Sequence, residues 1–398
     1  MTAADAADPV VIAGYARTPM GGFQGDFTGV KATDLGAVCV RAAVERAKVD
    51  PAAVERIFMG CVLPAGLGQA PARQAGLGGG LSINAQATTV NKMCGSGMQA
   101  AIMAYDALAA GSADVIVAGG MESMTNAPYA LPKHRGGARI GHDTIVDTMM
   151  MDGLEDAYTP GKAMGAFAED AVRMYQFTRE DQDRYALGSL SKAKAAIESG
   201  AFKREIAPVT VKGRAGEVVI DTDEQPGKAK PEKIPSLKPA FVKDGTITPA
   251  NSSSISDGAA ALVMTRQSVA MKLGMPIVAK VVGHEAHAHE PGLFTTAPVP
   301  AMQKLLKKVG WTVEDVDLFE VNEAFAVVAM IAQRELQIPE EKLNVNGGAC
   351  ALGHPIGASG ARILATLIAA LENRGLKRGL ASLCIGGGEA TAMAVELV

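Results

Sequence analysis

The fold turns on residues 89–97, which have the sequence Thr-Val-Asn-Lys-Met-Cys-Gly-Ser-Gly. Residues 86–90 form a short run with β-branched side chains, which predicts a strand, and residues 98–110 are rich in Ala, Met, Ile and Leu, which predicts a buried helix. Cys94 lies in the sharp turn between them, where the first N–H groups of the helix and the positive end of its dipole favour a thiolate. A structural cysteine packed beside a tight turn is the alternative.

Length and composition indicate a compact chain with more than one domain. The chain has 398 residues, which exceeds the size at which a single core keeps growing, so we expect two or three domains. Its 45 glycines form no collagen-like repeat and indicate tight turns and close backbone approaches. The net charge of −4 argues against a nucleic-acid partner, although it is compatible with a local basic patch for a phosphorylated ligand.

Cysteine usage and hydropathy bear on the compartment. The five cysteines are odd in number and far apart, and no pair has C-x-x-C spacing, so we expect no disulfide framework, no zinc ribbon and a reducing, cytoplasmic location. The stretch Met1–Pro9 is acidic and Ala-rich, without a signal or transit pattern. Charges or glycines interrupt each apolar run before about eighteen residues, so we expect no membrane-spanning helix and no membrane partner.

Strands that are apolar on both faces alternate with helices at both ends of the chain, which predicts an α/β fold with helices covering both sides of the sheet. From about residue 123 to residue 250 the composition changes to Met, Pro, Lys and Asp, and we interpret this segment as an inserted loop subdomain. The expected domains are an N-terminal half (1–122 plus 251–272), the insert (123–250) and a C-terminal half (273–398). Within the insert, Thr210–Ile220 is predicted to be a small hairpin.

Residues 343–389 repeat the order of residues 87–122. A strand at Leu343–Val345, a glycine-rich turn, an apolar helix and a strand that ends in glycines follow one another, as they do around Cys94. Ser96-Gly97 aligns with Ser359-Gly360, and Gly119-Gly120 aligns with Gly387-Gly388. Such self-similarity predicts two halves of one ancestral unit, packed about a pseudo-twofold axis with their glycine-rich turns facing the same place.

If the chain is duplicated, three more side chains, those of His354, Cys384 and Asn322, converge on the place where the two glycine-rich turns meet. His354 supplies the general base that a thiol of ordinary pKa needs. Cys384 is too distant in sequence from Cys94 to form a redox motif, so we favour a separate acid/base duty for it. Backbone N–H groups at Cys94 and at Gly386–Gly388 are candidates for an oxyanion hole. The alternatives are a turn role for His354, a core role for Cys384 and helix capping by Asn322.

The remaining charged motifs are less specific. His284, His287 and His289, followed by Glu290, do not have the spacing of a zinc site, so no metal is expected. A lysine-rich stretch is either a phosphate-binding patch or a solvated loop. It comprises Lys228, Lys230, Lys233 and Lys238.

Four segments resemble the signatures of the thiolase family. They are Asn-Lys-Met-Cys-Gly-Ser-Gly-Met (91–98), Asn-Glu-Ala-Phe (322–325), Gly-His-Pro-Ile-Gly-Ala-Ser-Gly (353–360) and Cys-Ile-Gly-Gly-Gly (384–388). The resemblance runs from about Val10 to Val398. It implies an acyl-CoA C-acyltransferase with a thiolase-like, five-layered α/β/α/β/α core, an inserted subdomain that binds coenzyme A, a homodimer or homotetramer, and no metal or redox cofactor. The Cys-Gly-Ser-Gly form is closer to the acetoacetyl-CoA branch of the family.

The resemblance also implies a mechanism. Cys94, deprotonated by His354, takes an acyl group from one CoA thioester, and Cys384 removes the α-proton of a second acetyl-CoA. The enolate then attacks the acyl-Cys94 carbonyl to give a 3-oxoacyl-CoA, and thiolysis is the reverse. Asn322, through a water, and His354 serve the enolate oxygen, whereas the N–H groups of Cys94 and Gly386 serve the tetrahedral intermediate.

The resemblance also implies which residues contact the substrate, and two segments near these residues differ from the pattern of the acetoacetyl-CoA branch. The expected CoA contacts are Ser252, Ser253, Met164, Lys228 and Phe325, of which Ser253 meets the pantetheine arm and Lys228 substitutes for an arginine near the nucleotide. The acetoacetyl-CoA branch commonly has His-Met-Gly where this chain has Ala-Met-Gly (163–165), and Met-Gly-Thr-Gly where it has Phe-Thr-Thr-Ala (294–297). Both segments border the acyl pocket or the pantetheine tunnel.

Two other functions compete with the thiolase interpretation. A condensing enzyme of fatty-acid or polyketide type would lack the second cysteine at a Gly-Gly-Gly turn, so Cys384 argues against it. A non-catalytic acyl-CoA or lipid carrier on the same fold would be expected to lose reactive residues. This chain keeps all four of them, in the predicted strand–turn–helix context.

Overall fold

The structure is a computed structural model that describes residues 8–213 and 216–398. Residues 1–7, which belong to the stretch without a targeting pattern, and residues 214–215, inside the predicted hairpin, lie outside the described residues. No helix among the described residues has both the length and the hydropathy that crossing a lipid bilayer requires.

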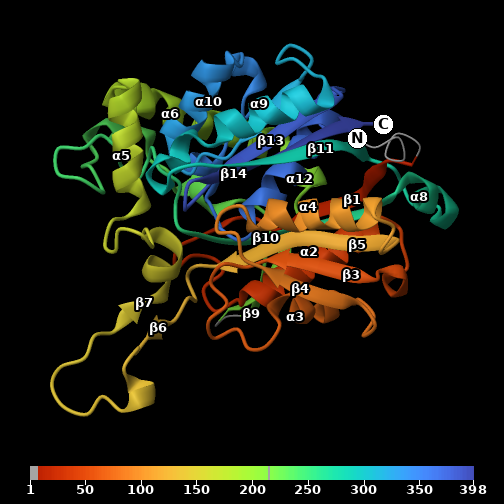
Figure 1. The fold of residues 1–398 in the computed structure, drawn as a ribbon, viewed down its shortest axis with the longest axis horizontal. Helices are drawn as coiled ribbons and strands as arrows, with labels where there is room; N and C mark the ends of the chain where they lie inside the picture. Colours follow the sequence, from red (N-terminus) through yellow and green to blue (C-terminus); the bar gives the residue numbers. More distant parts are fainter. Residues whose placement is uncertain (1–7, 214–215) are drawn as a thin grey trace.

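The N-terminal half alternates strands with helices, as the apolar runs predict (Figure 1). Its elements are β1 (Val10–Arg17), β2 (Gly21–Gly22), α2 (Ala32–Arg46), β3 (Arg56–Gly60), α3 (Pro71–Gly78), β4 (Gln86–Val90), α4 (Ser96–Ala109), β5 (Val115–Ser123), β10 (Ser256–Arg266) and α8 (Gln267–Leu273). The strand that precedes Cys94 is β4 and the helix that follows it is α4, so the predicted strand–turn–helix is confirmed.

The C-terminal half repeats this order. Its elements are β11 (Ala279–Ala288), α9 (Pro298–Val309), β12 (Leu318–Val321), α10 (Ala326–Leu336), α11 (Ala349–Leu352), α12 (Ser359–Arg374), β13 (Arg378–Ile385) and β14 (Glu389–Leu397). In both halves the first strand lies next to the last, and the strand after the buried helix pairs antiparallel with the last strand. The predicted duplication is therefore confirmed by the topology.

The two halves stack in five layers. Helices α2 and α3 cover one strand layer, α4 and α12 lie in the middle, and α9 and α10 cover the other strand layer (Figure 1). Three buried apolar clusters fill the spaces between these layers. The strand layers meet at one edge, because β1 pairs with β11 through Val11 and Ile12, so that within the described residues ten strands belong to one hydrogen-bonded sheet.

Glycines allow the middle helices to cross closely at their N-terminal ends. A Cβ on Gly360 would lie 2.2 Å from the Met98 nitrogen, and a Cβ on Gly97 would lie 2.8 Å from the Ala361 nitrogen. The first turns of α4 and α12 are thus in direct backbone contact, which brings the glycine-rich turns of the two halves to one place.

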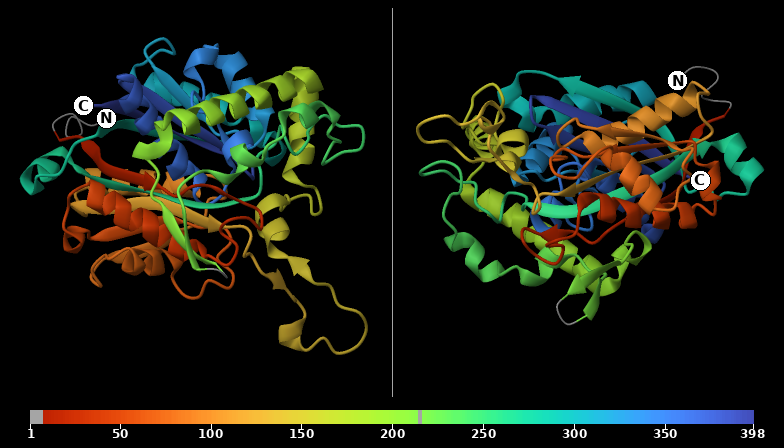
Figure 2. Two further views of the ribbon diagram at one scale, coloured as in Figure 1. Left: turned by 180° about the vertical axis from the view of Figure 1, so that it is seen from behind. Right: turned by 90° about the horizontal axis from the view of Figure 1, so that it is seen from below.

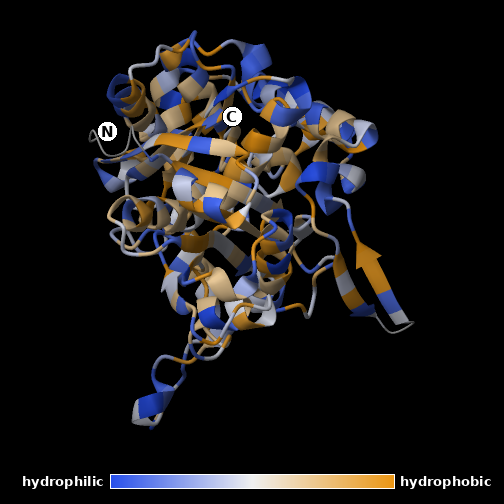
Figure 3. Ribbon diagram, turned by 90° about the vertical axis from the view of Figure 1, so that its right-hand side faces the viewer, coloured by the Kyte–Doolittle hydropathy of each residue, from blue (hydrophilic) through white to orange (hydrophobic). Residues whose placement is uncertain are grey.

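The inserted segment wraps one side of the core (Figure 2). It contains β6 (Tyr129–Ala130), β7 (Val146–Asp147), α5 (Met164–Tyr175), α6 (Arg179–Ser199), β8 (Val209–Gly213), β9 (Gly216–Ile220) and α7 (Glu224–Lys228). Helix α6 lies against α10 and α11 of the C-terminal half, and the β6–β7 segment projects as an arm (Figures 1 and 2). The predicted hairpin is β8–β9, which projects from the body and contains hydrophobic residues, as the colouring of its ribbon shows (Figure 3).

Two details of the predicted repeat are wrong. Leu343–Val345 is not a strand but contributes a single bridge, between Leu343 and Phe319, at the position that β4 occupies in the first half. Gly119 and Gly120 are not the counterparts of Gly387 and Gly388. They lie inside β5, where a Cβ on Gly120 would meet the Gly357 carbonyl oxygen at 2.0 Å, whereas Gly387 and Gly388 form the β13–β14 turn.

Candidate active site

The turn that carries Cys94 is strained at the residue that directly precedes it. Met93 has a φ of 47°, which a non-glycine side chain rarely adopts. The Ser96 hydroxyl accepts a hydrogen bond from the Lys92 N–H (2.8 Å) and donates one to the Met93 carbonyl (2.6 Å). These bonds close the turn and place the Cys94 sulfur at the start of α4.

Burial raises the pKa of the Cys94 thiol to about 11, although hydrogen bonds from the N–H groups of Gly386 and of Cys94 itself lower it. The backbone N–H groups therefore act in the expected direction, toward a thiolate, but the desolvation of the charged sulfur outweighs them. The same contacts show that a backbone donor from each half points at one sulfur.

The turn between β13 and β14 requires glycine. Gly387 and Gly388 have φ values of 95° and 87°, and a Cβ on Gly388 would lie 2.4 Å from the His289 carbonyl oxygen. This turn aims the Gly386 N–H at Cys94. Met164, the first residue of α5, lies beside it, because a Cβ on Gly386 would be 3.5 Å from the Met164 sulfur.

Cys384 lies in β13 and is buried. Burial raises the pKa of its thiol well above the ordinary value, and the nearby Cys94 raises it further. The two thiols are therefore close enough to influence each other's charge, although they come from different halves. All five cysteines are free.

His354 is buried with its ring in a defined tautomer. Its Nδ1 lies 2.6 Å from the Ser359 hydroxyl oxygen, and that hydroxyl donates its proton to the Pro355 carbonyl (2.9 Å). Ser359 can then only accept, so Nδ1 carries the proton and Nε2 keeps its lone pair. Burial, followed by the charge of Arg362, lowers the pKa of His354 to about 3. The ring is a neutral imidazole whose Nε2 is available as a base.

Asn322 follows β12 and reaches His354 from the other side. Its Nδ2 lies 3.5 Å from His354 Nε2, and its Oδ1 accepts a hydrogen bond from Arg362 Nη2 (3.3 Å). The alternative that Asn322 caps a helix is wrong, because α10 begins at Ala326 and no side chain caps its N-terminus. Within the described part of the chain, no hydrogen bond joins Cys94 to His354. The ring nitrogens of His354 contact the side chains of Asn322 and Ser359 instead.

The segment of Ser252 and Ser253 is attached to the loop that carries Asn322. The Ser253 N–H and hydroxyl both donate to the Ala324 carbonyl (3.0 and 2.9 Å), whereas the Ser252 hydroxyl donates to the Thr248 carbonyl (2.8 Å). Phe325 is buried, with its ring centroid 5.8 Å from that of Phe241.

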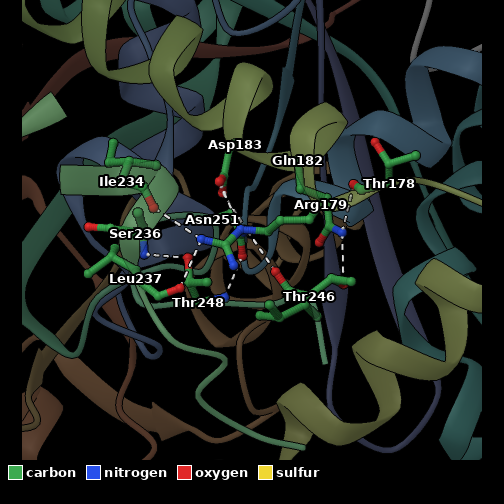
Figure 4. A network of polar contacts seen from close by, with 12 residues as sticks. Thr178, Arg179, Gln182, Asp183, Ile234, Ser236, Leu237, Thr246, Thr248 and Asn251 are labelled. Atoms are coloured by element: carbon green, nitrogen blue, oxygen red, sulfur yellow. Dashed lines mark hydrogen bonds and ion pairs between the residues drawn. The ribbon is translucent and has the colours of Figure 1, made fainter. Parts of the chain in front are cut away.

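A polar network behind this segment fixes it to α6 (Figure 4). Asn251 donates to Asp183 (3.0 Å) and to the Thr246 carbonyl (3.1 Å). Arg179 forms an ion pair with Asp183 and donates to the carbonyls of Ile234 and Leu237. Helix α6 is thereby linked to the loop of Ile234 and Leu237 and to the segment around Asn251 that leads into β10.

Lys228 forms an ion pair with Glu224 and lines a cavity of about 300 Å³. Two other lysines of the predicted patch, Lys230 and Lys233, line the same cavity, together with Ser254 and Cys350. Three lysines and an edge of the serine segment therefore share one groove. The phosphate-binding patch stays a prediction beside the solvated loop, since all three lysine side chains are exposed.

The described residues contain no group of His, Cys, Asp and Glu side chains that would hold a metal ion. His284 instead contacts Asp106 (3.1 Å), and His287 contacts Lys304 (2.9 Å). The arrangement of the two thiols, the imidazole and the backbone donors is that of nucleophilic and acid/base chemistry on an acyl group.

Two buried charged residues of the site were missed from the sequence. Glu122 accepts hydrogen bonds from the N–H groups of Val62 (2.9 Å), Leu63 (3.2 Å) and Gly357 (2.9 Å), and burial raises the pKa of its carboxyl to about 7. Arg362, in the first turn of α12, contacts Asn322. The sequence offered two signals for them. Glu122 is a carboxylate near the end of a strand that contains glycines, and Arg362 is an arginine in an otherwise apolar helix.

Comparisons with known proteins agree with this geometry. The family model of the thiolase N-terminal domain matches residues 10–268, and that of the thiolase C-terminal domain matches residues 275–397. The chain is 50% identical to acetyl-CoA acetyltransferase 2 of Arabidopsis thaliana (98% of this chain, 97% of the relative), and 46% identical to an acetyl-CoA acetyltransferase of Pseudomonas aeruginosa (96% and 98%).

Solved structures give the same result. The chain is similar to an acetyl-CoA acetyltransferase of Bacillus anthracis, with a TM-score of 0.95 and 41% identity (98% of this chain, 99% of that one). It is also similar to the Acat5 thiolase of Ascaris suum in complex with coenzyme A, with a TM-score of 0.93 and 42% identity (98% and 100%). The chain belongs to the thiolase family and is an acyl-CoA C-acyltransferase.

Proposed function

We propose that this chain is an acetyl-CoA C-acetyltransferase, which condenses acetyl-CoA with an acyl-CoA to form a 3-oxoacyl-CoA and catalyses CoA-dependent thiolysis in the reverse direction. The observation that carries the proposal is the meeting of two thiols from different halves, Cys94 and Cys384, at the N–H of Gly386, with the turn that carries His354 packed nearby, since Ile356 lies in the same apolar cluster as Cys94. The names of the relatives in plants and bacteria support the same reaction.

In the first half-reaction Cys94 is the nucleophile. Its sulfur attacks the thioester carbonyl while His354 Nε2 takes its proton. The carbon–sulfur bond to CoA then breaks, the Cys384 thiol gives its proton to the departing CoA sulfur, and the acyl-cysteine remains beside a Cys384 thiolate and a protonated His354. The N–H groups of Cys94 and Gly386 receive the negative oxygen of the tetrahedral intermediate. The hydrogen bonds of both N–H groups to the sulfur support this role, because they place two donors beside the reacting atom.

In the second half-reaction Cys384 removes an α-proton from acetyl-CoA. The carbanion attacks the acyl-Cys94 carbonyl, a carbon–carbon bond forms, and the Cys94 thiolate leaves. Asn322 and His354 stabilise the enolate oxygen. The base is the Cys384 thiolate left by the first half-reaction, and burial among apolar side chains supports this role because it raises the pKa of the thiol and so makes its thiolate a stronger base. Protonated His354 then returns its proton to the Cys94 thiolate.

Coenzyme A is proposed to bind between the insert (123–250) and the core. Ser252 and Ser253 lie on the segment attached to Ala324, and Lys228 lines the lysine groove, which suits a phosphate. Met164 beside Gly386, and Phe325 in its aromatic cluster, would border the acyl and pantetheine groups. The CoA complex of the Ascaris suum relative supports CoA as the ligand of this fold.

The acyl group is proposed to be acetyl or slightly longer. The unusual residue Ala163 directly precedes Met164, which lies against Gly386, and Phe294 packs against Phe325 with ring centroids 6.3 Å apart. A smaller side chain at residue 163 than the histidine of the acetoacetyl-CoA branch leaves more room beside the site.

We infer that the protein works as a homodimer or homotetramer in the cytoplasm, in fatty acid metabolism. β4, which leads to Cys94, lies at the edge of the sheet and its outer side is unpaired within the described chain. The β6–β7 arm carries exposed Tyr129, Ile140 and Ile145. Free cysteines agree with a reducing compartment.

The test uses labelled acetyl-CoA and two assays. Wild-type protein should form a stable labelled acyl-enzyme, and Cys94→Ser should form none. A normal yield of label in Cys94→Ser would contradict the assignment. Thiolysis kinetics with 3-oxoacyl-CoAs of increasing length then define the acyl group, and we expect activity on acetoacetyl-CoA and on chains a few carbons longer. Activity confined to long chains would contradict the proposed substrate.

A further inference from the structure

The side-chain amide of Asn322 has two unlike ends, and the structure holds it in one orientation. Oδ1 faces Arg362 Nη2 (3.3 Å), and Nδ2 faces His354 Nε2 (3.5 Å). Because a guanidinium has donors only, Arg362 can face the oxygen of an amide but not its NH₂ group. The reverse orientation would set two donors against each other at Arg362 and aim an acceptor at the lone pair of His354.

Among the residues that the structure describes, Arg362 forms no close ion pair that would explain why its charge is buried. It is fully buried in the first turn of α12, and its nearest carboxylate, that of Glu320 on β12, lies 3.8 Å from Nη1. Nε and Nη1 of Arg362, Oε1 of Glu320 and Oε2 of Glu205 have no hydrogen-bond partner within the described residues. A buried charge that is loosely paired lowers stability, so its presence beside the reacting groups points to function.

We propose that Arg362 is a positioning residue of the active site, which fixes the Asn322 amide so that its NH₂ group faces His354 and the water through which it serves the oxygen of the bound acetyl thioester. This role rests on the proposed thiolase reaction, in which Asn322 and His354 together stabilise the enolate. Arg362 touches neither thiol and acts through Asn322. Without it, the amide loses the contact that distinguishes its two ends, and the donor at the enolate oxygen is no longer held in place.

The charge of Arg362 has a second consequence for His354. Burial and then this charge lower the pKa of His354, which keeps the ring neutral. The other charges near Arg362 are Glu320 on β12, Glu205 at the end of the short helix Ala201–Arg204, Arg17 on β1, and Glu323 after β12. Their signs partly cancel. Loss of the guanidinium therefore raises the pKa of His354 and moves the acid limb of kcat to higher pH.

The test compares Arg362→Met and Arg362→Lys with Thr366→Val. Thr366 is the matched control, because it lies one turn further along α12, is buried, and donates to Glu205 (3.0 Å) without contacting Asn322. The measurements are labelled acyl-enzyme formation, exchange of the α-hydrogens of acetyl-CoA in D₂O, kcat and KM for condensation, and the pH dependence of kcat. Circular dichroism and thermal unfolding report whether each variant folds.

Folded Arg362→Met should lose α-hydrogen exchange and kcat by about 10²-fold, the usual effect of losing one oxyanion-hole donor, with little change in KM. Arg362→Lys should recover part of this loss and keep the acid limb near its wild-type position. Thr366→Val should retain wild-type exchange. Exchange at the wild-type rate in a folded Arg362→Met, or an equal loss in Thr366→Val, would overturn the proposal.

A double-mutant cycle keeps the proposal testable if Arg362→Met does not fold. Arg362→Lys should slow exchange in the wild-type background but cause no further loss in Asn322→Ala, because its effect passes through the amide. Equal losses in both backgrounds would overturn the proposal. Failure of the thiolase reaction itself would be recognised separately, as absence of label in the wild-type enzyme.

Discussion

The Cys94 sulfur is subject to two opposing influences. Backbone N–H groups stabilise a thiolate, whereas burial disfavours it, and burial is the larger effect because the pKa of the thiol rises to about 11. Burial also lowers the pKa of His354, to about 3. The resting pair is therefore an uncharged thiol and an uncharged imidazole. Proton transfer has to accompany the attack on the thioester, when the N–H groups of Cys94 and Gly386 meet the developing oxyanion.

The raised pKa of Cys94 predicts how the free enzyme reacts with an alkylating agent. Because only the thiolate reacts, the rate of carbamidomethylation at Cys94 should rise about tenfold per pH unit from about pH 7 to pH 9. Peptide mass spectrometry after timed exposure to iodoacetamide measures this rate. Cys350, whose pKa is raised by burial and by Glu323, serves as the comparison within the same sample. A plateau in the Cys94 rate below pH 8 would show that the thiolate is already formed at rest.

At the scale of elements, the crossing of α4 and α12 is what brings both halves to one site. Gly360→Ala should lower the free energy of unfolding by about 1–3 kcal/mol, because the new Cβ would lie 2.2 Å from the Met98 nitrogen and backbone would have to move. Gly188→Ala is the matched control. Gly188 lies within α6 with nothing within 4 Å of the added Cβ, so it should gain about 0.5–1 kcal/mol.

Urea denaturation of both variants measures the difference. The acyl-enzyme yield of Gly360→Ala should fall as well, because the displaced helix carries the turn of His354, whereas Gly188→Ala should keep its yield. Equal stability of the two variants would mean that the helix contact is looser than the structure indicates.

Element order could be predicted from the sequence, whereas some elements depend on tertiary contacts. Leu343–Val345 resembles a strand, but Asn344 has a φ of 45° and its side chain bonds both the N–H and the carbonyl of Val321 (2.9 Å each), replacing a backbone ladder. β14 (Glu389–Leu397) was not predicted. It is rich in alanine, and pairing with β13 on one side and β11 on the other makes it a strand.

The residues of the candidate site also fall into those that the sequence predicts and those that depend on tertiary contacts. Cys94, His354 and Cys384 could be predicted because each lies in or next to a glycine-rich turn, and repetition of that turn indicated that the turns meet. Arg362 and Glu122 could not, because a buried charge depends on partners from distant elements. The hydrogen-bond partner of Arg362 is Asn322, and those of Glu122 include the N–H groups of Val62 and Gly357. These contacts exist only in the folded chain.

At the scale of the whole molecule, buried carboxyls make stability depend on pH. Burial raises the pKa of the Glu122 carboxyl to about 7 and that of the Glu320 carboxyl to about 8, both well above the ordinary value of a glutamate. Both groups hold their protons more tightly in the folded than in the unfolded chain. Their stabilising contribution is complete below about pH 4.5 and is lost as the pH rises to about 8.

Thermal unfolding between pH 5 and pH 9 tests this dependence. The melting temperature of the wild-type protein should fall as the pH rises to about 8 and level off above it, and Glu320→Gln should reduce the slope because it removes one of the two groups. A melting temperature that rises across this window would contradict the assigned direction of the shifts.

The duplicated architecture gives each half one of the two thiols of the candidate site, and the proposed reaction uses them in different steps. We propose that Cys94, which follows β4 of the first half, carries the acyl group, and that Cys384, near the end of β13 of the second half, removes the α-proton. The middle helices and the β1–β11 edge hold the halves together, so neither half has a complete site. This division of work between the halves is the central claim.

The most direct test is α-hydrogen exchange of acetyl-CoA in D₂O by Cys384→Ala, measured beside acyl-enzyme formation in the same preparation. The account predicts that Cys384→Ala still forms the labelled acyl-Cys94 but no longer exchanges the α-hydrogens. Exchange at the wild-type rate in this variant would contradict it, because the base would then lie elsewhere.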